Sequence, residues 1–174
     1  MLWLKTVGIV LVIGSSGLYG MVGARRIEKR VSQLKNIRLA MNFLEKEITC
    51  MHTPLSQALL RTAKFSVPPV SVLFRETSVH LHGKQGLTAS EAWSQGLDRL
   101  RKESALSEDD LELLSSVAMQ IGMSNVDEQK KFFTLIQEEL RIQEEKSLAE
   151  VESGRKIWAY GGFILGTMVV LLLI

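Results

Sequence analysis

The chain has one cysteine, three prolines and few aromatic residues (6%) in its 174 residues. Because Cys50 is alone, an intramolecular disulfide is excluded, and nothing argues for an oxidising compartment. Strand signals, which would be short alternating runs of β-branched and aromatic residues, are nearly absent. The sequence therefore predicts an all-α protein.

Patterns that carry catalysis or bind a cofactor are also missing. His80 and His82 stand two residues apart, so on a helix they point to different sides, and no nearby Cys, Asp or Glu completes a metal site. There is no phosphate-binding glycine loop after a strand and no nucleophile elbow. The acidic clusters fit the solvated faces of helices. We expect a non-enzymatic protein with no catalytic residues, no metal and no cofactor.

Two long runs near the chain ends contain no charge, and Lys5 is the only charged side chain between either run and its chain end. TVGIVLVIGSSGLYGMVGA, residues 6–24, and IWAYGGFILGTMVVLLLI, residues 157–174, contain no charged side chain. About twenty apolar residues are needed for a helix to cross ~30 Å of hydrocarbon. We therefore predict three regions: an N-terminal transmembrane helix (1–24), a helical domain (25–156) and a C-terminal transmembrane helix (157–174).

A cleaved signal peptide is the alternative for the first run, since Val22 and Ala24 suit a small-residue cleavage site. Its length exceeds the usual 7–15 residues of a signal core. The Arg25–Arg26 pair that follows would also resist translocation. These two features favour an anchor.

Positive charge gathers on the inner side of both runs. From Arg25 to Arg38 there are six basic residues and one acidic residue, whereas Leu39 to Gly154 holds twelve basic and eighteen acidic residues. Basic residues beside a span prefer the cytoplasmic headgroup region, so we expect the middle domain in the cytoplasm. A nucleic-acid partner is disfavoured because no other basic patch is interleaved with aromatics. The predicted headgroup collar consists of Arg25, Arg26, Lys29, Arg30, Lys35, Arg38, Arg155 and Lys156.

Small residues mark both predicted spans. Glycine allows close approach of two helices in a membrane, although glycine is also common in spans without such a role. The spans could pair with each other or with other subunits. The candidate packing positions are Gly14, Gly17, Gly20, Gly23, Gly162 and Gly166.

Between the spans, apolar residues recur at helical spacing in six segments. The first predicted helix continues from the first span through Ile48, and Thr53 can cap a second one that begins at Pro54. The pair Pro68–Pro69 breaks the pattern before a third helix that carries Val72 to His82. This favours a six-helix antiparallel bundle with its two long helices continuing into the membrane.

Capping boxes predict where the last three helices begin. Thr88 pairs with Glu91, Ser107 with Asp110, and Ser124 with Asp127. The fourth helix carries Ala92 to Leu100, the fifth Leu111 to Ile121 and the sixth Phe132 to Leu148. Gly83 and Gly86 predict a turn, and Gly122 suits a C-terminal cap.

The chain resembles the stage III sporulation protein AB family along its whole length. The resemblance is carried by the glycine-rich first run with its basic stop, the terminal run, and the segments RLAMNFLEKEI, TPLSQAL, GLTASEAW and IGMSNVDEQ in that order. Such proteins are similar to the cytoplasmic domains of the inner-membrane platform proteins of type II secretion and type IV pilus systems. The family-like positions include Pro54, Leu55, Ala58, Leu59, Gly86, Leu87, Glu91, Ala92, Trp93, Gly122, Ser124, Asp127 and Gln129.

The resemblance implies a platform subunit of the secretion-like channel complex that joins mother cell and forespore, located in the mother-cell membrane. It implies a secretion-type ATPase and other channel subunits as partners, and homo-oligomerisation is left open. A platform subunit of a general secretion or pilus system is the alternative. No family-like position is catalytic; Gln129, which has no evident structural role in the sequence, is a candidate for a partner contact or a buried hydrogen bond.

Overall fold

A computed structural model describes residues 2–83, 86–121 and 126–173, with side-chain surroundings for 25–83, 86–121 and 128–154. The described residues form six helices and no strand. The predicted all-α class is thus confirmed. The helices are α1 (Leu2–Thr49), α2 (Leu55–Phe65), α3 (Val70–His82), α4 (Ala89–Glu103), α5 (Glu108–Gln120) and α6 (Val126–Leu173).

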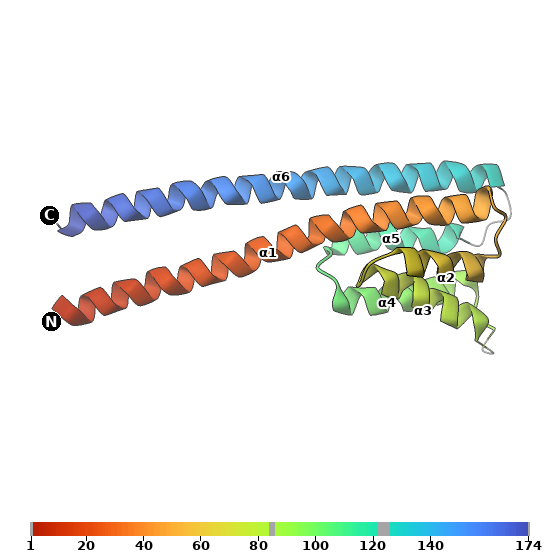
Figure 1. Ribbon diagram of the computed structural model, residues 1–174, viewed down its shortest axis with the longest axis horizontal. Helices are drawn as coiled ribbons and strands as arrows, with labels where there is room; N and C mark the ends of the chain where they lie inside the picture. Colours follow the sequence, from red (N-terminus) through yellow and green to blue (C-terminus); the bar gives the residue numbers. More distant parts are fainter. Residues whose placement is uncertain (1, 84–85, 122–125, 174) are drawn as a thin grey trace.

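The two long helices, α1 and α6, lie side by side and antiparallel, so that both chain ends are at the same end of the molecule (Figure 1). Each has 48 residues, which corresponds to about 72 Å at 1.5 Å per residue. The four short helices pack beside the half of this pair that is distant from the termini (Figure 1). We call the end of the bundle from which α1 and α6 continue towards the termini the exit end.

The predicted transmembrane segments are parts of α1 and α6 rather than separate helices. Among the residues whose surroundings are described, no helix has a stretch apolar and long enough to span a membrane. Residues 6–24 and 157–174 fall outside that range. The two spans, and the domain boundaries drawn from them, therefore stay predictions.

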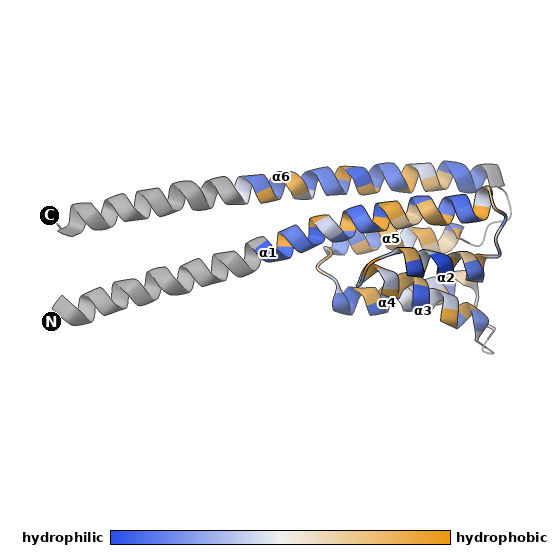
Figure 2. Cartoon of the chain, in the orientation of Figure 1, coloured by the Kyte–Doolittle hydropathy of each residue, from blue (hydrophilic) through white to orange (hydrophobic). Residues whose placement is uncertain are grey.

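The core of the bundle follows from the helical spacing of apolar residues. On α1, Leu34, Ile37, Met41 and Leu44 share one face and are completely buried. Hydrophilic and hydrophobic residues alternate along the described parts of α1 and α6, as expected of helices with one buried face (Figure 2). Trp93 of α4 is also buried, and its indole Nε1 donates to the Leu114 carbonyl of α5 at 2.8 Å. The shared apolar core packs the short helices with α1, and this hydrogen bond joins α4 to α5.

The helix boundaries agree with the sequence signals, with one exception. The break at Ser66–Pro69 and two of the three predicted capping boxes, Thr88–Glu91 and Ser107–Asp110, are present. The third, Ser124–Asp127, lies outside the residues whose side chains are described. The expected cap at Thr53 is wrong: α2 has no side-chain cap. The Thr53 hydroxyl instead donates to Glu47 Oε2 of α1 at 2.8 Å, because Glu47 lies buried beside this loop.

Glycine is required at two described positions. Gly86, in the predicted turn before α4, has a positive φ of 64°. Gly96 lies where α4 crosses α3, and a Cβ there would be 2.7 Å from the Leu73 carbonyl oxygen and 2.5 Å from Thr77 Oγ1. The two helices can approach this closely only because Gly96 has no side chain.

Candidate functional site

Four of the predicted collar residues are exposed and take part in no ion pair between described residues. Arg25, Arg26 and Lys29 lie within about one turn of α1 at the exit end, and Lys35 follows further along the helix. Their charges are therefore available to an external anion. Arg155 and Lys156 belong to α6, but their side chains lie outside the described residues.

Arg30 is placed differently, inside a charged cluster that joins three helices. Its Nε and Nη2 donate to the two carboxylate oxygens of Asp110 on α5 at 2.7 and 3.0 Å. Its Nη1 donates to Glu150 of α6 at 3.2 Å. The Asp110 side chain is fully buried, and only 12% of the Arg30 side chain is exposed. Arg30 thus stabilises the bundle and its charge is already compensated.

Asp110 is held ionised by this cluster. Burial, the largest influence, raises its pKa, but hydrogen bonds from Arg30 and from the backbone and hydroxyl of Ser107 outweigh it. The net result is a pKa below the ordinary range of an aspartate. Because Asp110 also closes the capping box of α5, one carboxylate serves both the helix end and the three-helix contact.

Further polar contacts fix the register of α1 against α6. Arg38 Nε donates to Glu144 at 2.9 Å, and Gln137 of α6 bridges Asn42 and Glu45 of α1 at 3.1 and 2.6 Å. Like Arg30, Arg38 has an internal partner. Within the predicted collar, the structure therefore leaves Arg25, Arg26, Lys29 and Lys35 as the described residues with free charge.

An open cavity of about 700 Å³ lies at the exit end between α1 and two loops of the bundle. Arg25, Arg26 and Lys29 line one side, and Pro68–Pro69 and Ser104–Ala105 line the other. The second loop is tied to α1, because the Ala105 amide donates to Gln33 Oε1 at 2.8 Å. The cavity is therefore a basic recess with a defined wall.

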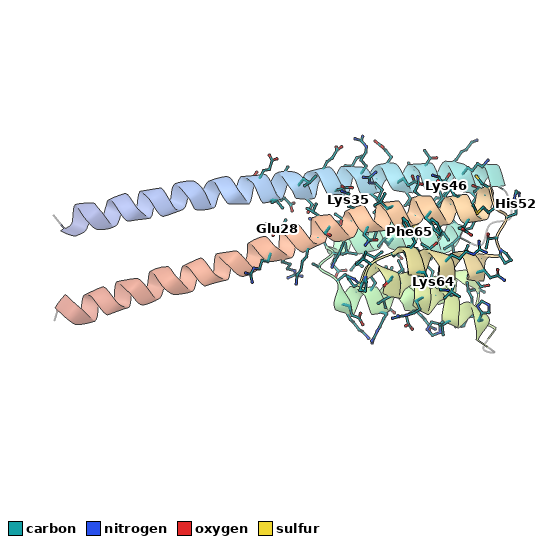
Figure 3. The ribbon with its side chains drawn as sticks, in the orientation of Figure 1. Glu28, Lys35, Lys46, His52, Lys64 and Phe65 are labelled. Atoms are coloured by element: carbon teal, nitrogen blue, oxygen red, sulfur yellow. The ribbon has the colours of Figure 1, made fainter. Side chains whose placement is uncertain are left out.

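A second surface feature is an apolar patch surrounded by lysines, which we call the lysine-rimmed patch. Phe43 of α1 stacks on Phe65 of α2 with ring centroids 4.7 Å apart, and Phe65 is 52% exposed. Leu39, one turn from Phe43, is 47% exposed. The rim consists of the exposed side chains of Lys35, Lys46 and Lys64 (Figure 3).

The family-like residues do not converge on one site. Pro54 precedes α2 and Leu55 is its first residue, Gly86 is in a turn, Glu91 completes the capping box of α4, and Trp93 is in the core. Their described contacts are those of caps, turns and core.

The remaining predicted sites are only partly visible. Gln129 is 4% exposed in the first turn of α6. Gly122 and Ser124 lie outside the described residues, as does the side chain of Asp127. The glycines at 14, 17, 20, 23, 162 and 166 lie in α1 and α6, but their surroundings are outside the described part. Helix packing at these positions stays a prediction.

No described part of the chain gathers three or more His, Cys, Asp or Glu side chains in a way that could hold a metal ion. His82 Nδ1 is 3.2 Å from the Ser78 carbonyl oxygen of its own helix. His80, on the same helix, is half-buried. This arrangement fits the expectation that the two histidines belong to a helix end.

Sequence reasoning missed the Arg30–Asp110–Glu150 cluster. It identified Asp110 as a capping residue and Arg30 as a collar residue, but it did not connect residues 80 positions apart. Glu28, the one acidic residue between Arg25 and Arg38, does not belong to this cluster and did not indicate it. The only available signal was Asp110 at a helix start with no nearby cation in sequence.

Comparison with known proteins agrees with the architecture. The model of the family "Stage III sporulation protein AB" matches residues 5–174. The Stage III sporulation protein AB of Bacillus subtilis (strain 168) is 29% identical over 170 residues, which cover 98% of this chain and 99% of the relative. A solved structure of a stage III sporulation protein AB superposes with a TM-score of 0.67 at 30% identity, covering 71% of this chain and 97% of that one. The chain therefore belongs to the stage III sporulation protein AB family.

Proposed function

We propose that the chain is a non-enzymatic platform subunit of the secretion-like channel complex between mother cell and forespore. In this proposal residues 1–24 and 157–174 cross the mother-cell membrane facing the forespore, and the bundle stands in the cytoplasm. Partner subunits, including the complex's ATPase, dock on the bundle. Membership of a sporulation family supports the sporulation role.

The observation that carries the proposal is the antiparallel pair of α1 and α6. Both helices leave the bundle at its exit end, so two anchors in one membrane are compatible with a single bundle on one side (Figure 1). In each of these helices a charge-free run lies in the part nearer the chain end, and Arg25–Arg26 and Arg155–Lys156 flank the two runs on the side of the bundle. Basic residues at both inner flanks favour the cytoplasmic side for the bundle.

The docking role is supported by the lysine-rimmed patch. Exposed apolar side chains surrounded by polar ones are typical of protein-interaction surfaces. Lys35, Lys46 and Lys64 have no ion-pair partner among the described residues, so the complementary partner surface would be apolar with acidic residues around it.

Cys50 provides the test, because it is the only cysteine and is exposed at the end of α1 distant from the termini. A membrane-impermeant maleimide added to intact protoplasts of vegetative cells that express the chain should leave Cys50 unlabelled, and permeabilisation should make it react. A Cys50→Ser/Ile174→Cys variant should react without permeabilisation, since the proposal places residue 174 outside. Labelling of Cys50 from outside would refute the orientation.

A further inference from the structure

Three cations in the exit-end cavity have no described partner. Arg25, Arg26 and Lys29 line it, and none of them forms an ion pair with a described residue. The one acid in the lining, Glu103, is engaged by Arg99 at 2.9 Å. Uncompensated positive charge in a recess raises the local concentration of anions. The cavity therefore favours an anionic ligand.

We propose that this cavity binds the phosphate group of an anionic lipid headgroup. Arg and Lys are the side chains that hold phosphate most strongly, through charge-assisted hydrogen bonds. About 700 Å³ lies within the roughly 300–1,000 Å³ usual for small-molecule sites, so a glycerol phosphate headgroup fits. That the phosphate comes from a lipid rests on the proposed anchoring of α1 and α6.

The opposite wall offers a neutral donor. The Ser104 hydroxyl oxygen is buried and has no hydrogen-bond partner among the described residues, and Ser104 lines the cavity. A buried polar group without a partner is costly, and a phosphate oxygen would supply an acceptor. The Gln33–Ala105 hydrogen bond holds this wall at a fixed place against α1. The site thus combines three cations with a wall that carries an unused hydroxyl.

The location selects a lipid as the source of the phosphate. The cavity opens at the exit end, beside the part of α1 that leads to the charge-free run ending at Ala24. In an anchored protein this part of α1 stands at the headgroup layer, where anionic phosphates are concentrated. A soluble phosphate ester could bind the same side chains, but it would not be concentrated beside the cavity as the headgroups are.

The experiment titrates short-chain phosphatidylglycerol into the full-length protein in micelles of an uncharged detergent, with phosphatidylcholine as the zwitterionic comparison. Each basic residue near an anionic lipid is worth about fivefold in binding, so Arg25→Gln/Lys29→Gln should lower the affinity for phosphatidylglycerol by about 25-fold. Lys35→Gln/Lys46→Gln removes the same charge from the same helix outside the cavity and should change the affinity less than about twofold.

A charge-neutral variant tests the cavity itself. Ser32 is exposed and lines the recess, so Ser32→Phe should obstruct it beside Lys29 and reduce phosphatidylglycerol binding while helicity stays unchanged. Wild-type binding in Ser32→Phe, or an equal loss in the control double variant, would overturn the site. Displacement of the lipid by an equal concentration of glycerol 3-phosphate would overturn the lipid as its ligand. Micellar binding does not depend on orientation, so its failure is distinguishable from failure of the topology tested with Cys50.

Discussion

The starts of α4 and α5 carry the same local motif in two different settings. At α4, Glu91 Oε2 accepts from the Thr88 amide at 2.8 Å, and Glu91 is exposed. At α5, Asp110 Oδ2 accepts from the Ser107 amide at the same distance, but Asp110 is buried and also binds Arg30. A distant cation therefore turns one capping box into a link between α1, α5 and α6, whereas the other stays a local helix stop.

The largest expected effect comes from removing the shared carboxylate. Asp110→Ala removes the carboxylate half of the α5 capping box and leaves Arg30 largely buried without its bidentate partner, so the free energy of unfolding should fall by about 3–5 kcal/mol. Urea unfolding of the full-length protein in micelles, followed by far-ultraviolet circular dichroism, measures this loss.

Asp109→Ala is the matched control, because Asp109 is the exposed neighbour in the same turn of α5. A surface substitution of this kind should change stability by less than about 0.5 kcal/mol. Equal losses in the two variants would mean that the buried ion pair contributes nothing beyond the helix start.

Acid should weaken the contribution of Asp110 to stability. The pKa of Asp110 is lowered in the folded protein, so its contribution is fully present above the unfolded pKa of ~3.9 and is lost as pH falls through the lower folded value. The stability difference between wild type and Asp110→Asn should therefore be constant near neutral pH and shrink below about pH 5. Unfolding curves at successive pH values measure it, and a difference that grows towards acid would contradict the assignment.

Local signals in the sequence predicted much of the fold, and partners distant in sequence explain what it missed. Helical periodicity, the prolines at 68 and 69 and two capping boxes placed the helices correctly, because each depends on residues within about one turn. Thr53 failed as a cap because Glu47, on another helix, takes its hydroxyl. The requirement for glycine at position 96 was not predicted, because it comes from the close approach of the α3 backbone at Leu73.

The predicted collar shows the same limit for the candidate site. Net charge along α1 identified a basic segment, but only tertiary contacts separate Arg30 and Arg38, which pair with acids of α5 and α6, from Arg25, Arg26 and Lys29, which do not. Those acids lie 80 and 106 residues away in the chain. The cavity was likewise invisible in the sequence, because loops after α2 and α4 build its wall.

The smallest expected effects come from removing the N-cap hydroxyls of α4 and α5. They test whether only the capping box of α5 is energetically coupled to Arg30. Thr88→Ala should cost about 1 kcal/mol, the usual value of an N-cap hydroxyl, and Ser107→Ala should cost a similar amount.

Each of these two substitutions is then combined with Arg30→Ala in a double-mutant cycle. The Thr88 cycle should be additive within about 0.5 kcal/mol, because Thr88 shares no partner with Arg30. The Ser107 cycle should show a coupling of about 0.5–3 kcal/mol, since the Ser107 hydroxyl and Arg30 both form hydrogen bonds with Asp110. Two additive cycles would mean that the cap of α5 is as local as that of α4, and that Arg30 acts on Asp110 without help from the helix start.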